Sequence, residues 1–101
     1  MKMYELISSI VLILARIDLI PTITCYSIKG HLAQGYTSKK PINTTCHNVY
    51  LILVSLAALG FLKKKGKNWV KIRHIPNTYE VIEMIYKSMK EVYNSRVLDS
   101  S

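Results

Sequence analysis

Acidic residues are missing from the whole middle of the sequence, since no Asp or Glu occurs between Asp18 and Glu80. The same stretch carries many lysines and all three histidines, and the chain of 101 residues has a formal net charge of +8. A solvated surface normally mixes both signs of charge, whereas an acid-free stretch attracts a polyanion. We therefore expect the partner to be a nucleic acid or an anionic membrane face.

Cysteine is scarce as well. Cys25 and Cys46 are the two cysteines of the chain, which is too few for a disulfide scaffold. Their spacing matches no zinc pattern even when His31 and His47 are included, so we expect no metal site. A single bridge between Cys25 and Cys46 stays open for an oxidising compartment or a hyperthermophile, with reduced thiols as the default.

Apolar runs long enough to cross a bilayer are also absent. Leu6–Ala15 and Val49–Leu62 are shorter than the roughly 20 residues that a spanning helix needs. Arg16 and Asp18 would lie inside any extension of the first run, and no small-residue cleavage site indicates a secretory signal. We expect a cytoplasmic protein, and a small membrane-associated protein remains a second alternative.

Catalytic groupings are not recognisable. The six carboxylates all lie in the terminal segments, up to Asp18 and from Glu80 onward. No Ser, His and Asp set, and no Cys and His set, has a recognisable spacing. We therefore expect no enzyme and no cofactor, and no small-molecule ligand is evident.

The first segment of the chain has the periodicity of a helix. Within Met3–Ala15 apolar residues recur at spacings of three and four, which predicts a helix with one buried stripe. Pro21 prevents this helix from continuing, and Thr22-Ile23-Thr24 alternates like a short strand. At this length, one domain with a single core is expected.

A second, shorter helix is expected over Ile28–Gln34. Ser27 is its predicted N-cap, and Ile28 and Leu32 lie at a spacing that turns both side chains inward. The next stretch, Tyr36–Pro41, is polar, contains two lysines and ends in proline. It is therefore interpreted as a turn between helices.

A longer helix follows this turn, capped by Asn43, Thr44 or Thr45 and stopped by Gly60. Its first turns are polar, whereas the residues from Val49 onward are apolar nearly all round. We expect one end of this helix at solvent or a ligand and the other end in deep burial.

After Gly60 the apolar and polar residues begin to alternate with a period of two. Lys67–Arg73 alternates from side to side, which predicts one arm of a basic β-hairpin. The hairpin tip carries Lys64, Lys65, Gly66 and Lys67. The lone Trp69 is expected to anchor the hairpin to the core.

A final helix is predicted after Pro76, with Asn77 as N-cap and Glu80 three residues later in a variant of the capping box. Its apolar residues alternate spacings of three and four, as in the seam between two paired helices. The seam consists of Tyr79, Ile82, Tyr86, Met89 and Tyr93. Pairing with a second copy and packing on the chain's own domain both remain open.

The order of helix, short strand, helix, turn, helix and basic hairpin resembles the winged helix-turn-helix of small prokaryotic, archaeal or archaeal-virus regulators. The likeness is most explicit from Val49-Tyr50 through Leu59-Gly60-Phe61-Leu62-Lys63 to Gly66–Ile72, where a recognition helix would run through a glycine into the wing. The fold class implied is mainly α with a small β-hairpin. Residues 1–76 would form the DNA-binding domain, and residues 77–101 would add a C-terminal dimerisation helix to the same domain.

This resemblance implies a transcriptional regulator that binds specific double-stranded DNA as a homodimer, in the nucleoid or, for a viral protein, in the host cytoplasm. Base edges would be read by polar side chains at the start of the recognition helix: Thr44, Thr45, His47 and Asn48. Contacts to the DNA backbone would come from lysines of the turn and the wing: Lys39, Lys40, Lys63, Lys64, Lys65 and Lys67. A winged helix used for protein contact is the main alternative.

Overall fold

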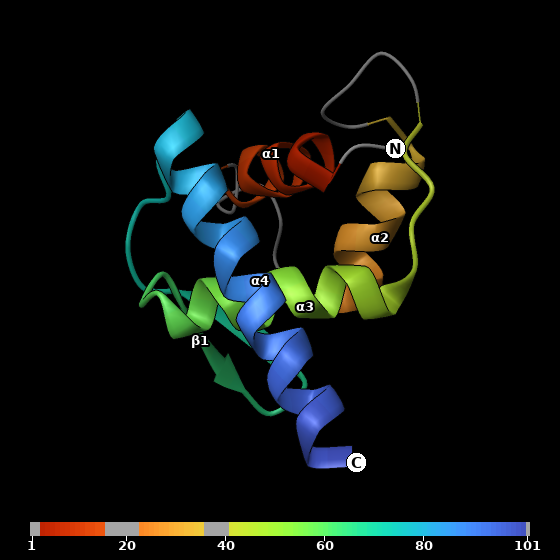
Figure 1. Ribbon diagram of the computed structural model, residues 1–101. Helices are drawn as coiled ribbons and strands as arrows, with labels where there is room; N and C mark the ends of the chain where they lie inside the picture. The colour runs from red at the N-terminus through yellow and green to blue at the C-terminus, as the bar shows by residue number, and fades with distance from the viewer. Residues whose placement is uncertain (1–2, 16–22, 36–40, 101) are drawn as a thin grey trace.

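The computed structural model describes residues 3–15, 23–35 and 41–100, with side chains up to Tyr93. Within these residues the chain is mainly helical and has a two-stranded antiparallel hairpin (Figure 1). This confirms the fold class predicted from the sequence. The elements are α1 (Met3–Ala15), α2 (Cys25–Ala33), α3 (Cys46–Ala58), β1 (Leu62–Lys65), β2 (Asn68–Lys71) and α4 (Tyr79–Ser100).

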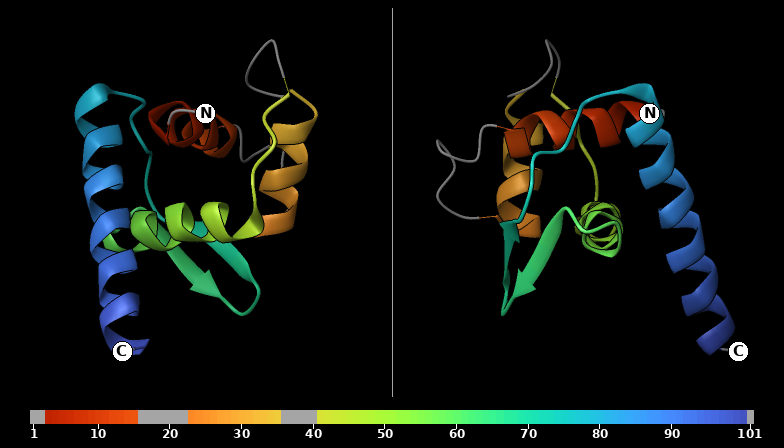
Figure 2. Two further views of the ribbon diagram at one scale, coloured as in Figure 1. Left: turned by 45° about the vertical axis from the view of Figure 1, so that its right-hand side comes forward. Right: turned by 90° about the vertical axis from the view of Figure 1, so that its left-hand side faces the viewer.

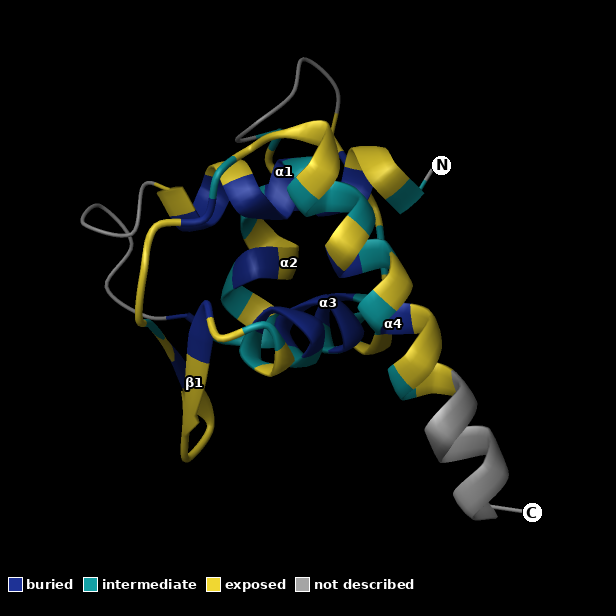
Figure 3. Ribbon diagram, turned by 60° about the vertical axis from the view of Figure 1, so that its left-hand side comes forward, coloured by how far each residue is buried: buried dark blue, intermediate teal, exposed yellow. Residues whose placement is uncertain are grey.

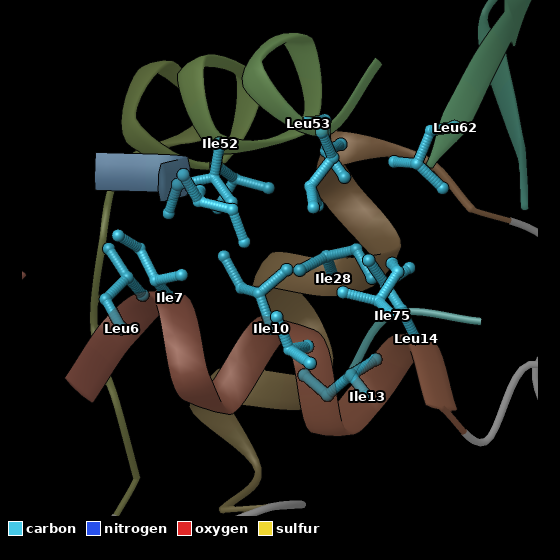
Figure 4. Packing of buried hydrophobic residues seen from close by; sticks show 14 of the residues in the cluster. Leu6, Ile7, Ile10, Ile13, Leu14, Ile28, Ile52, Leu53, Leu62 and Ile75 are labelled. Carbon is cyan, nitrogen blue, oxygen red and sulfur yellow. The ribbon is translucent and has the colours of Figure 1, made fainter. Parts of the chain in front are cut away.

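The apolar core is built on α1, whose bounds are those predicted. Ile7, Ile10 and Leu14 are buried and point from α1 toward Ile28 of α2 and Ile52 of α3 (Figure 4). The periodic stripe of the sequence is therefore the face that α1 buries. Removing such residues from water is the main stabilising contribution in a domain of this size.

α2 begins three residues earlier than predicted, because Thr24 and not Ser27 is its N-cap. Thr24 Oγ1 accepts a hydrogen bond from the Ser27 backbone N–H at 3.0 Å. In return, Ser27 Oγ accepts one from the Thr24 N–H at 2.9 Å, which completes a reciprocal capping box. Ile28 and Leu32 are buried, as predicted.

α3 has the cap and the stop that the sequence predicted. Thr45 is the N-cap, and its Oγ1 accepts the backbone N–H of Asn48 at 3.2 Å. After the last turn, Gly60 adopts a φ of 86°, a left-handed conformation that favours glycine. From Val49 onward most of the helix is buried, so its apolar residues form the centre of the core.

β1 and β2 form the predicted hairpin, with Gly66 in the connecting turn at a φ of 65°. The predicted tip is too long, because Lys64 and Lys65 lie in β1 and pair with β2, which leaves Gly66 and Lys67 in the turn. Trp69 is buried, and its backbone N–H donates to the Ile23 carbonyl at 2.9 Å. Its ring meets that of Tyr50 edge-on, with the centroids 6.2 Å apart. These contacts confirm Trp69 as the anchor of the hairpin. Ile23, in the strand-like segment before α2, forms an isolated antiparallel β-bridge with Trp69.

α4 begins one residue after Thr78, whose Oγ1 accepts the Val81 N–H at 3.4 Å. The prediction of Asn77 as the cap is wrong. Its side chain instead accepts a hydrogen bond from Ser8 Oγ of α1 at 3.1 Å. The Asn77 side chain therefore does not cap α4, because it is engaged in a hydrogen bond with a residue far away in the sequence.

α4 packs across α1 and α3 (Figures 1 and 2). Ile85 and Met89 on its inner side are buried, and Val81 and Val92 pack half-buried against the same core. Its outer side is largely exposed (Figure 3). The C-terminal helix is thus part of the domain that α1 to α3 build.

Candidate nucleic-acid interface

The outer face of α3 lies between two projections, the hairpin on one side and the C-terminal half of α4 on the other (Figure 2). Exposed and half-exposed residues of α3 include one stripe at helical spacing, made of His47, Tyr50, Val54 and Ala58. A cleft lies between α3 and the hairpin, and a groove lies between α3 and α4. The stripe is therefore flanked by two hollows that differ in chemistry.

The lysines of the hairpin divide between its two faces. Antiparallel pairing sets Lys64 opposite Trp69 and Lys63 opposite Val70. Because side chains alternate along a strand, Lys64 shares the inner face with the buried Trp69. Lys63 and Lys65 therefore lie on the outer face, so these lysines are not equivalent in position.

Lys64 is held above an aromatic pair at the edge of α3. Its Nζ lies 5.5 Å from the ring centroid of Tyr50 and 5.8 Å from that of Trp69, both within the range of a cation–π interaction. The side chain is nevertheless exposed. Its ammonium is thus positioned, and remains accessible to an anion that approaches α3.

The cleft beside Lys64 has a volume of about 300 Å³. Its lining consists of Thr24, Cys25, Tyr26, Tyr50, Lys64, Gly66, Lys67 and Trp69. The first turn of α2 thus faces the hairpin tip across it, and the N-terminus of a helix carries a partial positive charge. Among the residues that the structure describes, none that lines this cleft is acidic. With two lysines and a helix N-terminus, the cleft suits phosphate oxygens.

The predicted base-contact residues gather at the start of α3, in different environments. Thr45 is engaged as the N-cap. Thr44 and Asn48 are half-buried, and Asn48 Nδ2 donates to Thr44 Oγ1 at 3.4 Å. His47 is exposed. His47 is therefore the accessible side chain of the four that lacks a capping role, and Thr44 orients the amide of Asn48.

Two basic side chains of the middle segment serve the fold. Lys71 Nζ donates to the Leu14 carbonyl at the end of α1, at 3.3 Å. Arg73 Nη2 donates to the Leu59 carbonyl at the end of α3, at 2.8 Å, and its guanidinium lies 4.4 Å from the ring centroid of Phe61. Both cations thereby compensate the negative end of a helix dipole. The predicted backbone contacts Lys39 and Lys40 lie outside the described residues.

Tyr26 is a feature of this surface that sequence reasoning missed. Its side chain is 79% exposed in the first turn of α2 and lines the cleft beside Lys64. The late start predicted for α2 left Tyr26 in a linker. The signal that could have found it is Thr24 three residues before Ser27, since both residue types belong to a capping box.

Cys25 and Cys46 begin α2 and α3, and both are unbridged, half-buried thiols. Burial raises the pKa of the Cys25 thiol and Cys46 raises it further, whereas Lys64 lowers it. The two thiols are thus close enough to interact, and the ammonium of Lys64 acts on the same end of the cleft.

The predicted seam of α4 is divided between the core and the surface. Met89 is buried, and Ile82 and Tyr86 pack half-buried against the core. Tyr79 and Tyr93 are 67% and 54% exposed. Packing on the chain's own domain therefore accounts for the inner part of the seam, and the two outermost tyrosines remain accessible.

Comparison with models of known protein families, with curated proteins and with solved structures found no match. In the part of the chain that the structure describes, no three His, Cys, Asp or Glu side chains gather as a metal site requires. Among those residues, no helix has the length and apolar character needed to cross a membrane.

Proposed function

We propose that this protein binds double-stranded DNA and regulates transcription, using the start of α3 and the hairpin as one surface. The observation that carries the proposal is the cleft between α2, α3 and the hairpin, where Lys64 and Lys67 face a helix N-terminus and none of the described lining residues carries a carboxylate. Such a combination favours a phosphate chain, since cations and backbone amides bind the same oxygens.

In this mode the hairpin tip and the first turn of α2 hold the phosphates that border the major groove. Tyr26 adds a hydroxyl beside them, because it is exposed at the cleft. The start of α3 then faces base edges, with His47 accessible and Asn48 oriented by Thr44. Asparagine can make paired hydrogen bonds to adenine, so these side chains would supply sequence specificity.

A homodimer is part of the proposal, because a two-fold arrangement lets two copies of α3 read a near-palindromic site. The exposed Tyr79 and Tyr93 of α4 are apolar surface available for that contact. The proposed activity places the protein in the cytoplasm with the nucleoid, or in the host cytoplasm if the protein is viral.

A protein-binding winged helix is the second candidate, favoured by one observation. α3 carries no Lys, Arg, Asp or Glu, and its outer stripe continues from Tyr50 into Val54 and Ala58. An uncharged, partly apolar stripe is typical of protein contacts. Salt-dependent binding to duplex DNA is expected of the first candidate and not of the second.

The test is the affinity for a labelled duplex measured by fluorescence anisotropy at several salt concentrations. If Lys64 and Lys67 both bind phosphates, the logarithm of the association constant should fall against log salt with a slope of about −2 or steeper per chain. Unlabelled random DNA as competitor then separates specific from nonspecific binding. A folded protein that binds no duplex at low salt would contradict the proposal and favour the protein-binding candidate.

A further inference from the structure

The groove between α3 and α4 is a second hollow. It lies on the opposite side of the α3 stripe from the cleft beside Lys64. It has a volume of about 430 Å³, a size typical of small-molecule sites. Its apolar walls come from three helices: Met3 of α1, Leu51 of α3, and Met89 of α4. Met89 and Leu51 are buried core residues, so the base of the groove is fixed by the fold.

Polar groups gather at the rim of this groove. His47 and Asn48 line it from α3, and Lys90 lines it from α4. Lys90 Nζ lies 4.6 Å from the ring centroid of Tyr86, which itself forms part of the wall. None of the described residues that line the groove is acidic. The groove thus combines an apolar interior with a cationic rim, which is complementary to an anion that has an apolar body.

We propose that this groove binds a small monocarboxylate with an apolar tail, and that its occupation weakens DNA binding. The tail would lie on the methionines and Leu51, since methionine adapts its shape to an irregular ligand. The carboxylate would pair with the Lys90 ammonium, with the Asn48 amide and His47 within the same rim.

The coupling to DNA follows from shared residues. His47 and Asn48 line the groove, and they are the side chains that the proposed function directs to base edges. A ligand that engages them competes with DNA, and the competition is reciprocal. This second half of the inference rests on the proposed function, whereas ligand binding to the free protein does not.

The first experiment titrates octanoate, below its micelle concentration, into the full chain and follows saturation by calorimetry and by amide NMR shifts. We expect a single site with a Kd of about 1 mM or tighter and clearly weaker binding of octanol, which matches the tail and lacks the charge. Shifts should appear at Leu51 and Lys90. Absence of saturable binding, or equal binding of octanol, would overturn the proposed ligand class.

Two variants locate the site. Lys90→Met removes the rim charge and should weaken octanoate binding about fivefold. Lys87→Met is the matched control, because Lys87 is also exposed on α4 but pairs with Glu83 at 3.9 Å and does not line the groove. Equal affinities of the two variants would place octanoate elsewhere and refute the site.

The second experiment measures duplex affinity with and without octanoate. At an octanoate concentration ten times its Kd, mutually exclusive binding should lower the apparent DNA affinity about tenfold. Unchanged DNA affinity at saturating octanoate would refute the coupling. A protein that binds octanoate but no DNA under any condition would instead show that the proposed function fails while the ligand site stands.

Discussion

Replacing Lys64 and Lys67 together by glutamine should weaken DNA binding far more than replacing Lys63 and Lys65. Each double variant removes two positive charges from the same hairpin, so the net charge of the protein is matched. The two pairs differ in position. Lys64 and Lys67 line the cleft beside α2 and α3, whereas Lys63 and Lys65 share the outer face with Val70.

The magnitude follows from counterion release. Losing two phosphate contacts should reduce the salt slope by about 1.8, since each contact contributes about 0.9. If affinities converge near 1 M salt, the loss in affinity is about 60-fold at 0.1 M and about 20-fold at 0.2 M. The outer pair faces away from the cleft and acts on the phosphates only through solvent, where salt screens charges, so its loss should stay within about threefold.

Fluorescence anisotropy of one labelled duplex at four salt concentrations would give both slopes. Circular dichroism and urea unfolding serve as the control, because Lys64 lies over Tyr50 and Trp69. An exposed cation–π contact contributes only about 0.5–1 kcal/mol, so the fold should persist in Lys64→Gln. Equal losses for the two double variants would refute the assignment of the inner face as the DNA surface.

Four further substitutions or modifications should have measurable effects. Ile85→Ala should lower the free energy of unfolding in urea by about 2–5 kcal/mol, since Ile85 is buried where α4 meets the core; a loss below about 1 kcal/mol would argue against that packing. Gly60→Ala should cost about 1–2 kcal/mol because of its φ of 86°, although a Cβ there would have room, 3.6 Å from the nearest side chain. Burial and Cys46 raise the pKa of Cys25, so alkylation at pH 8.5, followed by mass spectrometry, should be slower for Cys25 in the native chain than in urea. The stability that the neutral Cys25 thiol contributes is fully present below the pKa of this thiol in the unfolded chain, and it is lost as the pH rises through the higher pKa of the folded chain. Tyr79→Glu with Tyr93→Glu should leave a folded monomer by light scattering, and an unchanged dimer would exclude this face as the contact.

Patterns decided within a few residues were predictable from the sequence. The apolar stripe of α1 has its observed bounds because spacings of three and four define a helix face by themselves. Gly60 ends α3 because a left-handed residue is needed there, and glycine adopts that conformation without a Cβ penalty. Trp69 was predictable as an anchor because a single large aromatic residue contributes much buried area.

Choices made by tertiary contacts were not predictable. The start of α2 is different, because the reciprocal bonds between Thr24 and Ser27 are local, and the spacing of these two residues in the sequence carried the signal. Asn77 is a good cap by residue type, but Ser8 of α1 engages its side chain. Alternation along the hairpin defined two faces, and only Trp69 packing against Tyr50 of α3 shows which face is inward.

The candidate site was predictable in residue types but not in arrangement. The start of α3 and the hairpin do lie on one side of the molecule (Figure 2), but the lysines divide between the two faces of the hairpin. Tyr26 could be assigned to the site only once the start of α2 was known. The role of the α4 seam depends on the burial of Met89 in the core of its own domain. Lys71 and Arg73 contribute to the positive charge of the sequence, yet their side chains hydrogen bond to the ends of α1 and α3.

The most direct test of the central claim is a titration of the isotope-labelled protein with a short duplex, followed through its amide NMR shifts. The proposed function predicts the largest shifts at the start of α3, in the first turn of α2 and at the hairpin tip, including His47, Tyr26 and Gly66. The same residues should lose these shifts when salt is raised. Shifts confined to the outer surface of α1 and α4, or no shifts at low salt, would contradict the claim that this surface binds DNA.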